Sequence, residues 1–114
     1  MENCIFCKIA SGEIKGDIVF QNESVVAFRD LSPQAPVHIL VIPRKHIATL
    51  NELAPADDNL VSKMVRTATE LADKEGLAEK GYRLVLNCNE QGGQSVFHIH
   101  LHLLGGRHMG WPPG

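Results

Sequence analysis

The chain has 114 residues, of which 44% are hydrophobic and 21% charged, and its formal net charge at pH 7 is −2. This composition is ordinary for one globular domain, and no run approaches the roughly 18 consecutive apolar residues of a membrane span. The charge offers no basic surface for a nucleic-acid polymer. We therefore expect neither a membrane nor a nucleic acid among the partners of this chain.

The start of the chain and its cysteines both bear on location. Glu2 is acidic and no basic segment follows it, which argues against a secretory signal. Three cysteines are an odd number, which suits free thiols or metal ligands better than a framework of disulfides. We expect a cytoplasmic protein.

The first half of the chain predicts short elements. Residues 4–10 read as a helical turn that ends at Gly12, because their apolar residues recur at three and four. A hairpin, a loop and a third strand should follow, since two prolines exclude regular structure from the loop. These segments are strands at 17–20 and 24–29, a loop at 31–36, and a strand at 37–42 that stops at Pro43.

The second half predicts one long helix and two further strands. A short helix or turn is expected in 46–53, and Pro55 opens a helix with a one-sided apolar stripe that stops at Gly76. Strands are expected at 82–87 and 97–104, followed by an irregular tail at 105–114. Hairpin-connected strands with one long helix predict an α+β fold with an antiparallel sheet.

The most informative stretch is a row of histidines after Gly-Gly-Gln-Ser. On a strand, alternate side chains share a face, so His98, His100 and His102 should lie opposite an apolar row. That row consists of Phe97, Ile99, Leu101 and Leu103. Three interpretations of the histidine row are open: the solvent-exposed face of an amphipathic strand, a metal site on alternate histidines, and attack by imidazole on phosphorus.

Attack on phosphorus makes specific demands that the sequence can meet. The nucleophile must be a neutral imidazole whose second nitrogen donates to a fixed acceptor, and the central His100 is best placed. Residues 92–95 offer backbone N–H groups and a hydroxyl for phosphate oxygens, and Asn87 could add an amide. Ser95 and His102 are candidate proton carriers for the leaving group. Asp30 is the kind of carboxylate that binds ribose hydroxyls.

Residues 98–104 match the His-φ-His-φ-His-φ-φ signature of the histidine-triad (HIT) superfamily, where φ is apolar. Residues 28–36, 38–43, 92–95 and 111–114 resemble its nucleotide-binding Hint branch, so the resemblance covers essentially all of 1–114 as a single HIT domain. It implies a nucleophile, His100, and a phosphate and proton-transfer site around it. The residues of that site would be His38, Asn87, Ser95 and His102.

The resemblance also implies a nucleotide pocket, an assembly and a reaction. The base would lie against Phe6, Ile9, Ile14, Phe28 and Leu31, the ribose against Asp30, and the phosphate near Gln94 and Ser95. Members of this branch are homodimers whose five-stranded sheets join, with the tail and Trp111 reaching the partner's site. They hydrolyse purine nucleoside phosphoramidates, such as adenosine monophosphate linked to an amine or lysine, through a nucleotidyl-histidine and without a catalytic metal.

A second set of residues resembles the structural zinc site of other triad proteins. Cys4, Cys7, His46 and His98 provide two thiolates and two imidazoles, a tetrahedral zinc set. The competing interpretation is two half-buried thiols on a small helix. Cys88 stands apart from this set and reads as a small packed residue.

Three other functions remain open beside a purine nucleoside phosphoramidase. A dinucleoside polyphosphate hydrolase or nucleotidyltransferase would use the same His100 with another leaving group. A nucleotide-binding interaction module would turn over only incidentally. A metalloenzyme with zinc on His98, His100 and His102 would lose activity on chelation. The natural leaving group and the preference for adenine or guanine do not follow from the sequence.

Overall fold

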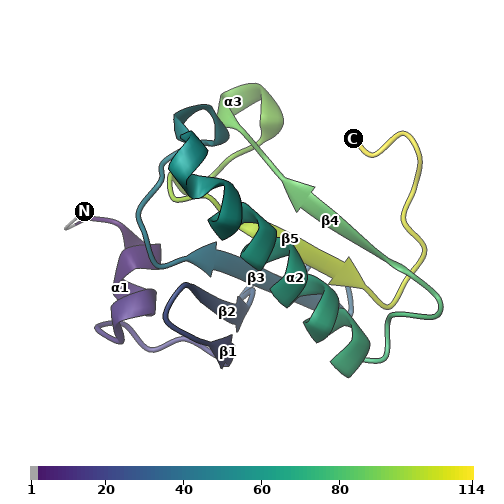
Figure 1. Ribbon diagram of the computed structural model, residues 1–114. Coiled ribbons are helices and arrows are strands. Elements are labelled where there is room, and N and C mark those ends of the chain that lie inside the picture. Colours follow the sequence, from purple (N-terminus) through teal and green to yellow (C-terminus); the bar gives the residue numbers. More distant parts are fainter. Residues whose placement is uncertain (1–2) are drawn as a thin grey trace.

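The computed structural model describes residues 3–114, and Met1 and Glu2, on which the expectation about a signal bears, lie outside the described residues. Five antiparallel strands form one sheet in the order β1-β2-β3-β5-β4, as Figure 1 shows. The strands are β1 (Ile18–Gln21), β2 (Val25–Arg29), β3 (Val37–Pro43), β4 (Tyr82–Leu86) and β5 (Leu101–Gly105). The expected α+β fold with an antiparallel sheet is confirmed.

Helices cover the two faces of this sheet. The short α1 (Ile5–Ser11) ends at Gly12, whose φ of 84° suits glycine, and the long α2 (Asp58–Lys74) crosses the other face (Figure 1). Pro55 opens the 3-10 turn Pro55–Asp57 that leads into α2, and a second 3-10 turn, Leu50–Glu52, lies in the expected turn region. The short N-terminal helix and the long helix are both confirmed.

Each face of the sheet has its own core. Under α2 the buried side chains are Val25, Ala27, Ile39, Val41, Ile47, Met64, Ala68, Leu71, Ala72, Leu77, Ile99, Leu101 and Leu103. Under α1 they are Phe6, Ile9, Ala10, Val26, Phe28, Leu40 and Ile42. Because neighbours along a strand alternate between faces, the histidines of the triad face the α1 side. Three of the four apolar residues of the row lie in the α2 core, but Phe97 is 49% exposed, so its expected core position is wrong.

The last strand is shorter than predicted. We expected 97–104, but β5 begins at Leu101, where it still pairs with Val41 of β3. The next position on β3 that could continue the ladder is near Pro43, which has no N–H to donate. Ile99 instead donates its N–H to the carbonyl of Ile47, at 2.8 Å. His98 and His100 therefore lie on an extended segment just before the strand.

A short helix that the sequence did not predict precedes this segment. The sequence predicts no element between the strands expected at 82–87 and 97–104, yet α3 (Asn89–Gly92) forms one turn that ends at Gly93 with a φ of 83°. The Gln94 N–H closes this turn on the carbonyl of Asn89, at 3.1 Å. Within residues 3–114 no helix is both long enough and apolar enough to cross a membrane.

Candidate active site and metal cluster

His100 is held with one ring nitrogen free. Its Nδ1 lies 2.8 Å from the carbonyl oxygen of His98, and a carbonyl only accepts, so Nδ1 carries the proton. The lone pair of His100 is therefore on Nε2. The ring is buried and packs edge-on against Phe6, with the ring centroids 5.0 Å apart. This is the tautomer and the fixed orientation that an imidazole nucleophile needs.

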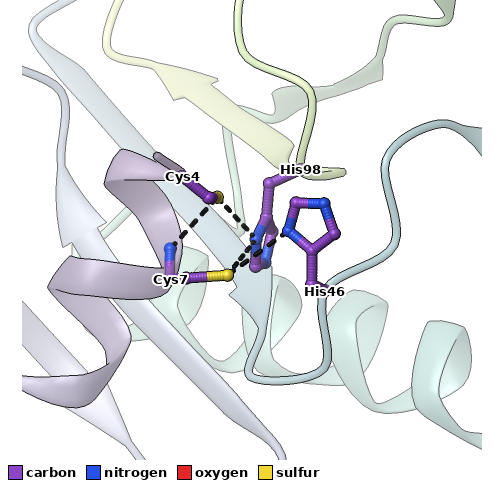
Figure 2. A group of neighbouring side chains, drawn as sticks. All are labelled: Cys4, Cys7, His46 and His98. Atoms are coloured by element: carbon purple, nitrogen blue, oxygen red, sulfur yellow. Dashed lines mark hydrogen bonds between the residues drawn. The ribbon is translucent and has the colours of Figure 1, made fainter. Parts of the chain in front are cut away.

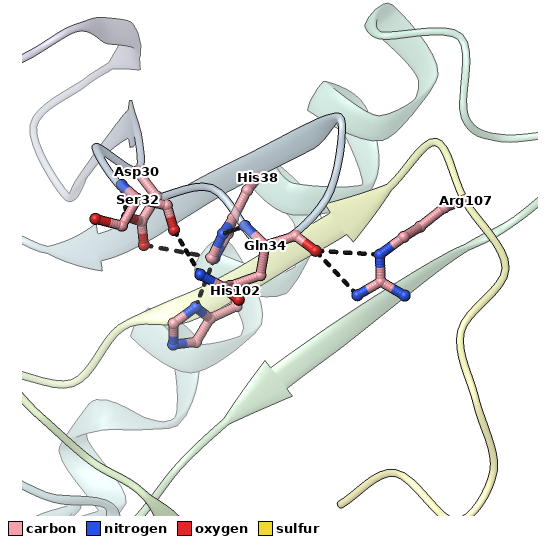
Figure 3. Close-up of polar contacts among 6 residues, drawn as sticks. All are labelled: Asp30, Ser32, Gln34, His38, His102 and Arg107. Carbon is pink, nitrogen blue, oxygen red and sulfur yellow. Dashed lines mark hydrogen bonds and ion pairs between the residues drawn. The ribbon is translucent and has the colours of Figure 1, made fainter.

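A second chain of hydrogen bonds fixes the ring of His102 (Figure 3). The backbone N–H of Gln34 donates to Nδ1 of His38 at 3.0 Å, so His38 carries its proton on Nε2. That Nε2 lies 2.9 Å from Nδ1 of His102 and 3.5 Å from Oδ2 of Asp30. His102 accepts at Nδ1, and its own proton is therefore on Nε2. His102 therefore offers an N–H donor at Nε2, and its ring centroid lies 4.9 Å from that of His100.

Burial keeps the rings of His38 and His102 neutral. Burial lowers the pKa of His38, although the negative charge of Asp30 acts in the other direction. Burial, together with the neighbouring His100 and His38, lowers the pKa of His102 to about 4. At neutral pH, His38 and His102 therefore act as hydrogen-bonding groups without charge.

The lowered pKa of His102 makes the stability of the fold depend on pH. In the unfolded chain histidine takes up a proton below about pH 6.5, whereas folded His102 does so only near pH 4. The unfolded state thus binds protons first, and stability should be full above about pH 7 and fall as the pH drops through this window. We expect the melting temperature of His102→Gln to fall less between about pH 7 and pH 5 than that of the wild type. His108→Gln, an exposed tail variant, should keep the wild-type slope, and equal slopes for all three proteins would contradict this assignment.

Hydrogen bonds within the protein already occupy most polar groups of the loop after α3. The Gln94 side chain is buried, accepts from the Asn89 N–H at 2.8 Å and donates to the carbonyl of Ala48 at 2.7 Å. The Gly93 N–H is also used, by the carbonyl of Glu90. Ser95 is exposed, and its N–H and hydroxyl have no hydrogen-bond partner among residues 3–114. Of this loop, Ser95 is thus the group most available to a phosphate. The assignment of Gln94 to nucleotide binding stays a prediction.

The residues predicted for the base pocket divide into two groups. Phe6, Ile9 and Phe28 are buried together near His100, with Phe6 and Phe28 edge-on at 5.4 Å. Ile14 lies near the surface, and Leu31 is 96% exposed. The structure thus places an apolar wall beside His100 and a large exposed apolar side chain at the loop after β2.

The four expected metal ligands come together from three parts of the chain (Figure 2). Cys4 is the N-cap of α1 and Cys7 lies in its first turn, His46 follows β3, and His98 precedes β5. The Nδ1 of His98 is 3.3 Å from the sulfur of Cys4 and 3.5 Å from that of Cys7, and the Nδ1 of His46 is 3.3 Å from Cys7. All four donor atoms lie within 4.8 Å of one another.

The chemistry of this cluster fits a metal ion. His98 donates from Nε2 to the carbonyl of Pro43 at 2.7 Å, so the lone pair on Nδ1 points at the two sulfurs. Donor atoms around a tetrahedral zinc lie about 3.4 to 3.8 Å apart, close to the separations seen here. Burial and the neighbouring Cys4 raise the pKa of the Cys7 thiol to about 11, so a cation would be needed to hold both sulfurs as thiolates. The residues present are compatible with a metal.

Comparisons with known proteins identify the family and agree with this fold. The HIT domain family model matches residues 11–109, and the chain therefore belongs to the HIT family. The purine nucleoside phosphoramidase of Escherichia coli K12 is 51% identical over 109 residues, which are 96% of this chain and 92% of that protein. A HIT family hydrolase of Legionella pneumophila is 58% identical with a TM-score of 0.97, covering 98% of this chain and 100% of that one.

A more distant relative has the same fold. The histidine triad nucleotide-binding protein of Candida albicans is 31% identical, with a TM-score of 0.83 over 96% of this chain and 83% of that one. The sequence interpretation did not single out Gln34, whose N–H donates to His38, or Arg107, whose guanidinium donates to the carbonyl of Gln34. Both contacts use main-chain atoms of Gln34, which leave no residue pattern to read.

Proposed function

We propose that the protein hydrolyses purine nucleoside 5′-phosphoramidates, such as adenosine monophosphate joined through nitrogen to an amine or lysine. The observation that carries the proposal is the tautomer of His100. Its Nδ1–H donates to the carbonyl of His98, so the lone pair is on Nε2. The relative named purine nucleoside phosphoramidase, 51% identical over nearly the whole chain, supports the substrate class.

The reaction would proceed in two displacements. Nε2 of His100 attacks the α-phosphorus, the P–N bond breaks, and the leaving nitrogen keeps the electron pair and takes a proton from His102 Nε2–H or the Ser95 hydroxyl. Water then attacks phosphorus, the bond to His100 breaks, and the proton lost by water restores the donor. Free amine and nucleoside monophosphate result. We assign no cofactor to these steps.

The remaining predicted residues would bind and orient the nucleotide. Asp30 lies 3.5 Å from Nε2 of His38, and we propose that its carboxylate binds the ribose hydroxyls. We propose that Asn87 and Ser95 donate to phosphate oxygens and that the apolar wall of Phe6, Ile9 and Phe28 receives the purine, with Ile14 and Leu31 at its rim. A catalytic metal on the triad is disfavoured, because Nδ1 of His98 faces the cysteines and Nδ1 of His102 faces His38.

A comparison of substrates tests this function. The protein should hydrolyse adenosine 5′-phosphoramidate with a kcat/KM at least about tenfold above that for diadenosine polyphosphates. A reversed preference would favour the polyphosphate hydrolase. Nucleotide binding with no turnover of either substrate would favour the interaction module.

We further propose that Cys4, Cys7, His46 and His98 hold one structural zinc. Four protein ligands leave no open coordination position for substrate, which is typical of a structural site. The ion would tie α1 to the segment that carries His98, whose carbonyl orients His100. A cytoplasmic location is proposed as well, because all three cysteines are free thiols.

We also propose a homodimer formed through β4, with residues 1–114 acting as one domain. β4 lies at the edge of the sheet and pairs on one side only, with β5. An edge strand of this kind can pair with a second copy and continue the sheet. In the tail, Trp111 is 83% exposed, which suits a side chain that would complete the partner's site.

The tail should therefore act on the leaving group. We expect deletion of residues 108–114 to change kcat/KM across a series of amine leaving groups by about tenfold, with little change in melting temperature. Steady-state kinetics of the full and shortened chains would measure this. An unchanged series, or a protein that is monomeric by light scattering at micromolar concentration, would contradict the shared site.

A further inference from the structure

The backbone of Gln34 forms hydrogen bonds with two different parts of the molecule (Figure 3). Its N–H donates to Nδ1 of His38, and its carbonyl accepts from Nε of Arg107 at 3.1 Å and from Nη2 at 2.9 Å. Arg107 belongs to the tail that follows β5, whereas Gln34 lies in the loop between β2 and β3. A bidentate guanidinium contact has a defined geometry, so it holds this loop residue in one orientation.

The glycines before Arg107 allow the chain to pass close to the loop of Gln34. Gly106 has a φ of +92°, and a Cβ at this position would lie 2.8 Å from Cβ of Pro36. A Cβ on Gly105 would lie 2.5 Å from Cδ1 of Leu77. Position 106 therefore requires glycine, and the chain leaves β5 packed against Pro36 of the loop that contains Gln34.

The N–H of Gln34 is the donor that occupies Nδ1 of His38 and so keeps the proton of this ring on Nε2, where Asp30 Oδ2 lies 3.5 Å away. If this N–H turned away, Nδ1 of His38 could take the proton, and Nε2 would then present a lone pair to Nδ1 of His102. Two lone pairs would face each other at 2.9 Å, and His102 would have to move its proton to Nδ1. The N–H donor of His102 beside His100 would be lost. The same logic argues against a metal on Asp30, His38 and His102, because Nε2 of His38 donates.

We propose that Arg107 is a positioning residue for the proton donor of the reaction: by holding Gln34 it fixes the tautomer of His38 and, through it, that of His102. The residue would not touch substrate and acts through two intermediate residues, Gln34 and His38. This inference rests on the proposed function for its kinetic consequence, but not for its structural one, since the tautomers exist in the resting protein.

Arg83 provides a matched control. It is also an arginine that donates to a main-chain carbonyl of the tail, from Nη2 to Gly110 at 2.9 Å, but it does not contact the loop of Gln34. If Arg107 merely anchored the tail, Arg83→Ala should imitate Arg107→Ala. If Arg107 acts on the histidines, the two variants should differ.

The test combines NMR with kinetics on full-length Arg107→Ala, Arg107→Lys and Arg83→Ala. Two-bond ¹H–¹⁵N correlations of the histidine rings, recorded without ligand, should give single Nε2–H tautomers for His38 and His102 in the wild type and in Arg83→Ala. Arg107→Ala should give mixed tautomers and lower kcat for adenosine 5′-phosphoramidate by about tenfold, with KM changed less than about twofold. Arg107→Lys, with one point donor, should fall between the two.

Three results would overturn the inference. These are unchanged tautomers in Arg107→Ala, the same tautomer changes in Arg83→Ala, or an effect of Arg107→Ala on KM alone. If the wild type does not turn over phosphoramidates but the tautomers change as stated, the proposed function fails and the role of Arg107 stands.

Discussion

Replacing His100 with asparagine is expected to lower the rate of phosphoramidate hydrolysis by about 10⁴-fold or more while leaving nucleotide affinity within a fewfold of wild type. Asparagine keeps a polar side chain of similar reach next to Phe6 and can still donate to the carbonyl of His98. It lacks the Nε2 lone pair, so the covalent step has no nucleophile. Single-turnover kinetics and calorimetric titration with adenosine monophosphate would measure the two quantities.

A graded comparison separates this role from a general effect of the histidine cluster. His102→Ala should cost about 10²-fold, because water and the Ser95 hydroxyl can partly replace a proton donor. Its effect should also shrink for leaving groups that depart without a proton. If His100→Asn retained substantial turnover, or if His102→Ala cost as much as His100→Asn, the division of roles proposed here would be wrong.

The second large effect concerns the metal cluster. Protein prepared without chelator should contain about one zinc per chain, and replacing Cys4 and Cys7 by serine should remove it. A ligand present at a hundredfold its dissociation constant contributes about 2.7 kcal/mol, which for a domain of this size corresponds to a melting temperature lower by about 10 °C or more. The rate per folded molecule should change much less, because the ion does not touch substrate.

Cys88 is the control for this experiment. It is a free thiol that lies outside the cluster of Cys4, Cys7, His46 and His98, so Cys88→Ser should keep both the zinc and the melting temperature. Metal analysis by mass spectrometry and thermal denaturation would measure them. A wild type that contains no zinc and is not stabilised when zinc is added would leave Cys4 and Cys7 as packing residues.

The elements of the fold were largely predictable, because the apolar periodicity of the segments is strong. The stripe of α2 and the alternation around the triad both indicate where each side chain lies. The alternation holds even before β5 begins, since Ile99 is buried in the α2 core while His98 and His100 face the α1 side. The predicted start of β5 was wrong. It depends on Pro43, which is distant in sequence and has no N–H to donate to the ladder.

The candidate site was predictable where side chains carry the chemistry and not where the backbone does. The histidines and cysteines come together as their spacing suggested. The turn of α3 was missed because its short helix is closed by Gln94, through contacts that sequence periodicity does not encode. The bonds of Gln34 with His38 and Arg107 were missed for the same reason, since main-chain donors and acceptors exist at almost every residue.

The most direct test of the account is the stereochemical course at phosphorus, with a phosphoramidate made chiral by sulfur and hydrolysed in isotopically labelled water. Each in-line displacement inverts phosphorus, so two displacements through a nucleotidyl-His100 give overall retention. Retention in the thionucleotide product is the predicted result. Overall inversion would mean that water attacks the substrate directly, and it would contradict a covalent role for His100.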